Sequence, residues 1–384
     1  MKRLVWRSDH SWLLPLAWAL LYLCGCAPPA ERVLQPARVA SLDYSALFPT
    51  DIKLAPDGTV WVAYIDAATR QLRIKQNDRP SELLPTQHHA QQTEFSFSLA
   101  LTAGGAPAIA YVAEPSGDLV YAERRSARWT TETIDADGQV SYFVSLAFDR
   151  QGRPHLSYFD QTNNDVKYAA RTESGWRIET IDASGLPGFH IPAGFTRLAL
   201  VCVPSPQQCT VEQPRVAYLA YRYKPYDGEL RYAAYDGQSW QIEVVDSARG
   251  AGGFPSLALD QTGQPWISYY RLSTWDFTLG ELRLAHRGAH GWQIEVIDQG
   301  DYVGRYNALA LTPEGRPVIA YNVATPGVLR LAWRDQRWQR ARVAAADASG
   351  AWVALALDPD SAAHLTYADA NAHITRSITV DIPD

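Results

Sequence analysis

Short apolar runs bounded by turn residues recur along the chain, and the clearest group lies between Gly253 and Asp298. The runs in this stretch are Ser256–Leu259, Trp266–Tyr270, Glu281–Ala285 and Trp292–Ile297. Runs of four to eight residues that are rich in β-branched and aromatic side chains, with turn residues between them, are typical of β-strands. This stretch therefore predicts four consecutive short strands.

The same four-strand unit repeats along the chain. The first strand carries Leu-Ala followed by an aliphatic or aromatic residue, and these signatures begin at Leu99, Leu146, Leu198, Leu257, Leu309 and Leu355, with Leu54-Ala55-Pro56 as a degenerate first copy. A tyrosine closes the second strand, at Tyr64, Tyr111, Tyr158, Tyr218, Tyr269, Tyr321 and Tyr367. A tryptophan opens the fourth strand, at Trp129, Trp176, Trp240, Trp292 and Trp338. The chain thus contains seven copies of one unit.

Seven copies of four strands, mostly about 47 residues apart, predict an all-β fold, a seven-bladed β-propeller of four-stranded antiparallel blades. Inner strands crowd together near the axis, so we expect one small residue in each, and alanine fills that place in all seven copies. A two-sheet sandwich predicts neither the period nor this alanine. The last copy lacks a fourth strand, and we expect Arg38–Leu42 to supply it and close the ring. The propeller is then predicted to span residues 38–384.

Composition supports this fold and excludes one class of function. The 384 residues include 13 Trp and 20 Tyr but one Met, which favours strands over helices. The formal net charge of −6 argues against nucleic acid as a partner, because nucleic-acid-binding proteins usually carry a basic patch or stripe.

The N-terminus predicts export and a lipid anchor. Basic residues precede an apolar run that ends at Leu23, as in a signal peptide. Leu23-Cys24-Gly25-Cys26 resembles the bacterial lipobox, which implies cleavage after residue 25 and lipid on Cys26; an ordinary signal peptide is the alternative. Ala27 then resembles a signal for the outer membrane in bacteria with two membranes. Residues 26–37 are predicted to form a tether, and the membrane is expected to be a partner through the lipid.

The other two cysteines, Cys202 and Cys209, lie in an insertion between the first and second strands of the fourth copy. A close pair in an exported protein is typical of a disulfide, and zinc would need further ligands, such as histidine, that are not nearby. We predict no metal and no cofactor. Motifs for a nucleophilic serine, a phosphate-binding loop or a zinc protease do not occur.

Ser145–Ile181 and Ser256–Ile297 follow the pattern SLALD-x-x-G-x-P-x-ISYYD, then a Tyr-Ala strand and a Trp strand. This pattern resembles a bacterial family of exported propeller proteins and implies a sialidase-like propeller architecture. The sialidase Asp box, Ser-x-Asp-x-Gly-x-x-Trp, does not occur in that form. The resemblance implies little about activity.

Candidate binding residues lie in the loops that follow the fourth and second strands, because propeller ligands usually bind at that mouth of the channel. An aromatic residue precedes the first strand at Phe143, Phe195, Phe254, Tyr306 and Trp352. These five could form an aromatic collar for a sugar ring or a peptide side chain, or each could plug the top of its own blade. The loops after the second strands of copies four and five are the longest of their class, and they predict a site between blades four and five from Tyr221, Arg222, Tyr223, Tyr226, Tyr270, Arg271, Trp275 and Phe277.

The sequence favours a lipid-anchored binding or scaffolding module of the cell envelope, with a glycan or an envelope protein as its ligand. The alternative is a carbohydrate-active enzyme, a sialidase-like glycosidase that uses carboxylates at the channel mouth. Asp66, Asp160 and Asp369 end second strands there and could act as acid and base, or they could cap the turns that follow. A third hypothesis, an assembly partner in the envelope, predicts an exposed apolar patch.

Overall fold

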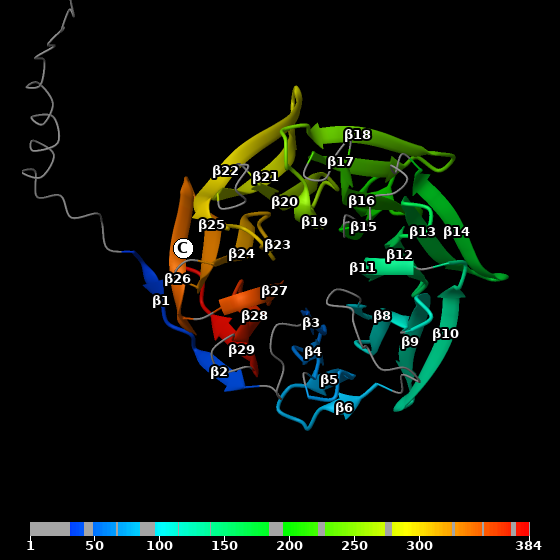
Figure 1. Ribbon diagram of the computed structural model, residues 1–384, viewed down its shortest axis with the longest axis horizontal. Coiled ribbons are helices and arrows are strands. Elements are labelled where there is room, and N and C mark those ends of the chain that lie inside the picture. The colour runs from blue at the N-terminus through cyan, green and yellow to red at the C-terminus, as the bar shows by residue number, and fades with distance from the viewer. Residues whose placement is uncertain are drawn as a thin grey trace, which may run out of the picture. The chain divides into compact units, whose positions relative to one another are not determined.

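Seven blades, each with four antiparallel strands, surround a central axis, which confirms the predicted β-propeller (Figure 1). The structure is a computed structural model, and it describes residues 31–41, 49–66, 68–84, 97–113, 115–138, 140–183, 195–221, 227–272, 279–324, 327–347, 349–369 and 374–383. Within these ranges the helical structure consists of one 3₁₀ turn, Pro206–Gln208. We number the blades one to seven along the chain and the strands of each blade from the axis outward.

Each blade takes four strands that are consecutive in the chain, except the last. Blade one contains β3 (Thr50–Leu54), β4 (Val60–Ile65), β5 (Leu72–Gln76) and β6 (Glu82–Leu83). Blade two contains β7 (Phe97–Leu101), β8 (Pro107–Ala113), β9 (Asp118–Arg125) and β10 (Arg128–Asp135). Blade three contains β11 (Val140–Phe148), β12 (Pro154–Asp160), β13 (Asp165–Thr172) and β14 (Gly175–Asp182). Blades four and five contain β15 (Thr196–Val203), β16 (Val211–Tyr221), β17 (Gly228–Tyr235), β18 (Trp240–Asp246); and β19 (Gly253–Leu259), β20 (Pro265–Leu272), β21 (Leu279–Gly288), β22 (Gly291–Asp301). Blade six contains β23 (Ala308–Leu311), β24 (Pro317–Val323), β25 (Val328–Arg334), β26 (Trp338–Asp347), and blade seven begins with β27 (Ser349–Leu357), β28 (Ala363–Asp369), β29 (Ile374–Val380).

The N-terminal strand closes the ring, as predicted. β2 (Arg38–Ser41) pairs antiparallel with β29 and forms the outer strand of blade seven. β1 (Val33–Leu34), within the predicted tether, pairs in parallel with β26 at the outer edge of blade six. Two successive strands of the N-terminal segment are therefore hydrogen-bonded to the last two blades.

Inner strands pack leucine against alanine from one blade to the next. Leu198 of blade four shares a hydrophobic cluster with Ala147 of blade three, and Leu309 of blade six shares one with Ala258 of blade five. Because neighbouring sheets converge toward the axis, one of each facing pair has to be small. This geometry explains why alanine recurs in the inner strands.

Blade one departs from the predicted register by two residues. The turn hydrogen bonds of Ala55 match those of Thr102 in blade two, so both residues follow the inner strand and do not belong to it. Lys53 consequently occupies the place that Ala100 has in blade two, and the prediction of alanine in all seven copies is wrong for blade one. The ammonium group of Lys53 lies 2.5 Å from the Asp51 carboxylate, which balances its charge.

A buried polar contact, which we call the interblade clip, joins neighbouring blades. Between blades four and five, the Tyr269 hydroxyl donates to Asp246 Oδ2 over 2.6 Å, and Arg283 Nη1 donates to the same oxygen over 2.8 Å. Burial, together with the Asp246 carboxylate, raises the pKa of Tyr269 well above its usual range and keeps the hydroxyl a donor. The other clips are Tyr158, Asp135 and Lys167; Tyr218, Asp182 and Arg231; and Tyr321, Asp298 and Arg330.

The tryptophans of the fourth strands connect the outer edges of the blades. Trp292 Nε1 donates to Glu243 in the preceding blade over 3.1 Å, while Arg287 lies over the Trp292 ring and pairs with the same carboxylate. Trp240 and Trp338 make equivalent bonds to Glu179 and Glu295. The predicted disulfide between Cys202 and Cys209 is confirmed, and it closes the hairpin between β15 and β16.

The interblade clip predicts an order of destabilisation. Asp246→Ala leaves Arg283 and Tyr269 without their shared buried acceptor, and we expect it to lower the free energy of unfolding by about 3 kcal/mol. Tyr269→Phe keeps the ion pair and removes one neutral donor, so a loss of about 1 kcal/mol is expected. Urea unfolding followed by tryptophan fluorescence measures both. Asp301→Ala, an exposed aspartate of blade five, is the control; equal losses for Asp246→Ala and Tyr269→Phe would contradict the clip.

Candidate functional site

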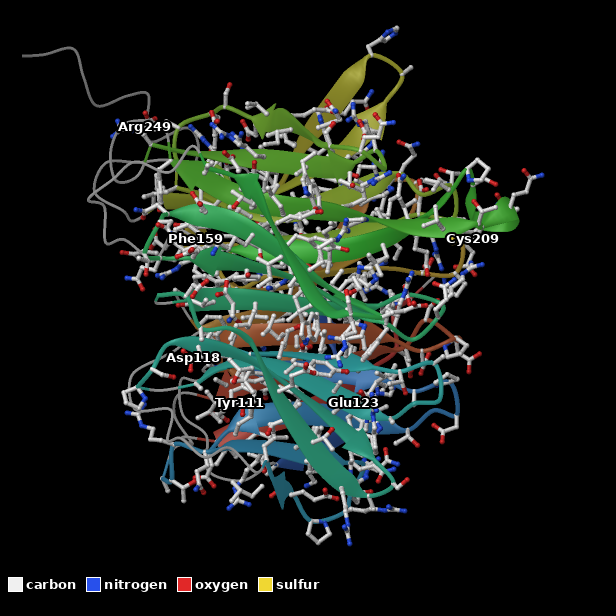
Figure 2. All side chains as sticks on the ribbon, turned by 90° about the vertical axis from the view of Figure 1, so that its right-hand side faces the viewer. Tyr111, Asp118, Glu123, Phe159, Cys209 and Arg249 are labelled. Carbon is white, nitrogen blue, oxygen red and sulfur yellow. A yellow bond between two sulfur atoms is a disulfide. The ribbon has the colours of Figure 1, made fainter. Side chains whose placement is uncertain are left out.

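The antiparallel blades bring the loops after the second and fourth strands to one end of the propeller, which we call the channel mouth. Figure 2 shows Asp118, Phe159 and Arg249, all next to such loops, toward one end, and Cys209 at the opposite end. The disulfide-closed hairpin therefore lies away from the candidate binding residues.

Five aromatic side chains line the mouth in one continuous series across blades three to seven. Successive ring centroids from Phe143 through Phe195, Phe254 and Tyr306 to Trp352 are 3.7, 4.1, 4.5 and 4.4 Å apart. Phe143 is buried, and the other four are half-buried. The five predicted aromatics, which we call the aromatic arc, therefore contact one another across blade boundaries. Ligand binding by the arc stays a prediction.

The backbone holds four of these aromatics in the left-handed region. The φ angles are 67° at Phe143, 51° at Phe254, 50° at Tyr306 and 55° at Trp352. Bulky residues rarely adopt this conformation, and it persists only where the surroundings hold it in place. The series of ring contacts thus rests on a locally unfavourable backbone.

Side chains of the neighbouring blades hold this backbone. Asn307 Nδ2 of blade six donates to the Phe254 carbonyl over 3.0 Å, and Ser268 Oγ of blade five donates to Asn307 Oδ1 over 2.5 Å. Between blades three and four, Thr196 Oγ1 donates to the Phe143 carbonyl over 2.9 Å. Two of the strained residues are therefore fixed by a hydrogen bond from the next blade.

Arg305 lies over the middle of the arc. Its guanidinium carbon is 5.7 Å from the Phe254 ring centroid, 5.7 Å from that of Tyr302 and 5.2 Å from that of Tyr306, and Nη2 donates to the Tyr306 hydroxyl over 3.5 Å. In the described part of the chain, no carboxylate lies within ion-pair distance of this guanidinium. The mouth therefore presents a positive charge on an aromatic floor.

Tyr270 extends the aromatic surface from the second strand of blade five. Its ring meets Phe254 edge-to-face with centroids 6.4 Å apart, and it fits against Gly280, where a Cβ atom would lie 2.2 Å from the ring. Its hydroxyl is buried and has no hydrogen-bond partner among the described residues. Burial raises the pKa of Tyr270 to about 12, so the side chain is a neutral phenol and not a base.

Arg197 supplies a second positive charge inside the channel. It stands on the inner strand two residues beyond Phe195, which is about 7 Å along an extended chain. The side chain is solvent-exposed although protein surrounds it, as expected for a residue in the channel. Desolvation by the surrounding protein lowers the pKa of the guanidinium and Asp51 partly offsets this, but an arginine stays charged. Like Arg305, Arg197 has no carboxylate within ion-pair distance in the described part of the chain, so neither charge is cancelled by an ion pair.

The predicted site between blades four and five lies largely outside the described residues. Arg222, Tyr223, Tyr226, Trp275 and Phe277 are not described, so that site stays a prediction. Tyr221 is half-buried at the end of β16. Arg271 pairs with Glu281 over 2.8 Å and donates to the Arg249 carbonyl, so its guanidinium is held by contacts within the protein.

The candidate acid and base residues are occupied by structural contacts. Asp66 and Asp160 accept backbone N–H groups of the turns that follow them, and each pairs with a cation of its own blade. Asp369 pairs with Arg376 over 2.6 Å. Sequence reasoning missed Tyr302 and Arg305, although both stand in a glycine-bearing loop of the type that marked the arc.

Comparison with known proteins supports the fold. No protein-family model matches the chain, and no curated protein matches its sequence. Virginiamycin B lyase from Staphylococcus aureus is similar in structure, with a TM-score of 0.59, 9% identity and coverage of 90% of this chain and 99% of that one. An ulvan lyase of polysaccharide lyase family 25, bound to -[GlcA(1-4)Rha3S]-, has a TM-score of 0.59, 11% identity and coverage of 89% and 96%. The SapL1 lectin in complex with α-methyl fucoside has a TM-score of 0.50, 14% identity and coverage of 79% and 99%. At these identities the likeness shows a shared propeller fold.

The hydrogen bonds behind Phe254 predict energetic coupling between Ser268 and Asn307. Each single alanine variant leaves a buried polar partner unsatisfied, and we expect Asn307→Ala to destabilise the fold by about 1–3 kcal/mol. The double variant is expected to cost less than the sum of the two single variants. A double-mutant cycle by urea unfolding measures the coupling, and additive losses would show that the two side chains act independently.

Proposed function

We propose that this propeller is a binding module for an anionic carbohydrate, which it takes at the channel mouth. The observation that carries the proposal is Arg305, a guanidinium lying on the aromatic arc without a carboxylate partner in the described part of the chain. Aromatic faces suit the apolar face of a sugar ring, and an unpaired guanidinium suits a carboxylate or sulfate group.

The charges favour an anionic ligand over a neutral one. Arg305 at the mouth and Arg197 in the channel give this axis a positive local potential although the whole chain has a formal net charge of −6. Two of the similar structures support the carbohydrate class, since one is a lyase bound to a glucuronate- and sulfate-containing saccharide and one is a lectin bound to a fucoside.

Binding is favoured over catalysis. A glycosidase needs two carboxylates about 5–10 Å apart that are free to act on the substrate. Asp66, Asp160 and Asp369 instead pair with cations of their own blades. Tyr270, the buried phenol next to the arc, has a pKa raised to about 12, which opposes a role as a base near neutral pH.

The proposed setting is the cell envelope, with lipid on Cys26 as the anchor. No helix in the described part of the chain has the length and apolar character of a membrane span. A lipid at residue 26 would leave a short segment before β1, so the propeller would be held close to the membrane surface.

Arg305→Gln is expected to weaken binding of an anionic polysaccharide at least about tenfold, because it removes the charge and keeps a polar side chain of similar length. Affinity electrophoresis in gels containing ulvan or polyglucuronate measures the change on protein that lacks residues 1–26. Arg287→Gln is the matched control, since Arg287 also lies over an aromatic ring but is paired with Glu243. Equal retardation of wild type and Arg305→Gln by every anionic polysaccharide would overturn the proposed site.

Cys26→Ser is expected to abolish lipid labelling and release the protein into the soluble fraction. The thiol is the acceptor of the lipid in the lipobox, and a serine hydroxyl is not. Growth with radiolabelled palmitate, followed by fractionation, measures this outcome; Cys24→Ser is the control. Labelling of the Cys26→Ser protein would remove the anchor from the proposal.

A further inference from the structure

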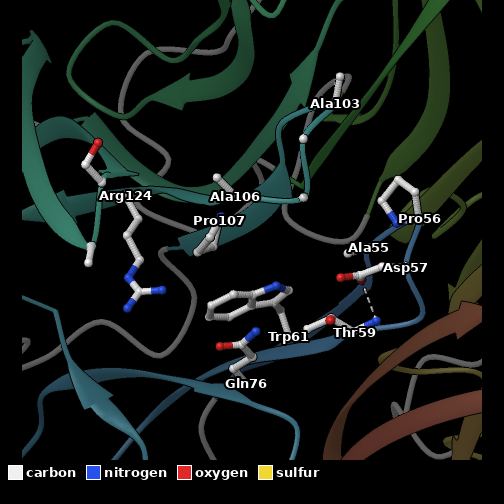
Figure 3. Close-up of a pocket in the computed structure, with 14 residues that line it drawn as sticks. Ala55, Pro56, Asp57, Thr59, Trp61, Gln76, Ala103, Ala106, Pro107 and Arg124 are labelled. Carbon is white, nitrogen blue, oxygen red and sulfur yellow. Dashed lines mark hydrogen bonds between the residues drawn. The ribbon is translucent and has the colours of Figure 1, made fainter.

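A cavity opens at the end of the propeller opposite the channel mouth. It has a volume of about 390 Å³ and lies between blades one and two, with Trp61, Gln76, Pro107 and Arg124 among its lining residues (Figure 3). We call it the interblade pocket. Its volume falls within the range of about 300–1,000 Å³ that is usual for small-molecule sites.

Equivalent positions in other blades show why the pocket exists here. His155, Trp266 and His364 take the place of Trp61 in blades three, five and seven. A ring nitrogen of each forms a hydrogen bond with the aspartate that opens the adjoining turn. The bonds are His155 to Asp149 over 3.3 Å, Trp266 to Asp260 over 3.4 Å and His364 to Asp358 over 3.0 Å. The turn of blade one has the same backbone hydrogen bonds but begins with Ala55. The carboxylate that caps the ring elsewhere is therefore missing from blade one.

This exchange leaves an indole N–H without a carboxylate cap at the pocket. The Trp61 residue as a whole is 4% exposed, but its Nε1 is not one of the buried polar atoms that lack a partner, so this atom is reached from the pocket. An indole N–H acts only as a donor, and one that lines a cavity without a cap is available to a ligand oxygen. Figure 3 shows the indole between Arg124 on one side and Asp57 on the other.

The charged side chains around the pocket do not favour an anionic ligand. Arg124 lies with its guanidinium carbon 5.8 Å from the Trp61 ring centroid and pairs with Glu82 over 2.9 Å. Its Nε is buried and out of direct reach of a ligand in the pocket, so Arg124 contributes a balanced charge and not a free donor. A hydrogen bond from the Thr59 backbone lowers the pKa of Asp57, so this carboxylate at the pocket is an acceptor.

We propose that the interblade pocket binds a neutral, polyhydroxylated ring, that is, one residue of an uncharged sugar. Trp61 Nε1 donates to a hydroxyl oxygen of the ring, and Asp57 accepts from a hydroxyl group. This site is independent of the mouth, uses the opposite end of the propeller and selects against the anionic groups proposed for the mouth. Ala55 is the residue that distinguishes it from the capped positions of the other blades.

The indole N–H resonance of Trp61 tests the proposal directly. It is assigned by its loss in Trp61→Phe and followed in ¹⁵N-labelled protein lacking residues 1–26. The probes are methyl glycosides of neutral hexoses and 6-deoxyhexoses, up to about 50 mM to cover millimolar affinities. We expect at least one of them to shift the resonance in a saturable manner, and methyl glucuronide to bind at least about tenfold more weakly than the best neutral probe.

Two variants separate the pocket from the fold and from the mouth. Ala55→Asp restores the ring cap seen in blades three, five and seven, and we expect it to weaken the best probe at least about tenfold. Thr312→Asp adds the same charge at the equivalent turn position of blade six and should leave binding unchanged. Arg305→Gln should also leave it unchanged, so failure of the mouth proposal does not affect this result. If no neutral glycoside shifts the Trp61 resonance, or if Ala55→Asp binds as well as wild type, the proposal is wrong; saturation transfer to the probe in Trp61→Phe checks the contribution of the N–H group.

Discussion

The interblade clip is the contact on which the rest of the structure depends. A buried aspartate is costly unless several donors surround it, and here a tyrosine of the next blade and a lysine or arginine together satisfy it. Asp135, Asp182 and Asp246 are the last residues of their strands. The chain that leads from each of these aspartates to Phe143, Phe195 or Phe254 therefore starts from a point that the clip has fixed. Ring geometry and mouth geometry are thus set by the same polar contacts.

The aromatic arc also depends on contacts between neighbouring blades. Left-handed backbone at Phe254 and Tyr306 is unfavourable locally, and real proteins break local rules mainly at functional sites. The strain at Phe254 is offset by Asn307 and Ser268, which belong to two different blades. A mouth built in this way is already ordered before a ligand arrives, so binding does not have to supply the ordering entropy.

The sequence predicts the fold well because its strongest marks are packing residues. Leucine, alanine and tyrosine recur where blades meet, because the same contact in successive blades requires the same residue type at the same position of the repeat. The Leu-Ala signature gives the wrong register for blade one, because Ile52 and Lys53 stand where blade two has Leu99 and Ala100. The turn hydrogen bonds reveal the correct register. The arc could be proposed from position alone, since each ring stands three residues before the Leu-Ala signature of its inner strand. The long loops of blades four and five lie largely outside the described residues, so their role stays a prediction.

Arg305 could not be identified as a binding residue from the sequence, because the feature that distinguishes it is the lack of a carboxylate partner among the described residues. Three other described arginines that lie over aromatic rings are paired: Arg124 with Glu82, Arg171 with Glu132 and Arg287 with Glu243. In these three the cation and the ring belong to a structural contact between blades, and the carboxylate balances the charge. Arg305 lies over aromatic rings but has no carboxylate partner among the described residues. Its guanidinium is therefore available to an anionic group of a ligand.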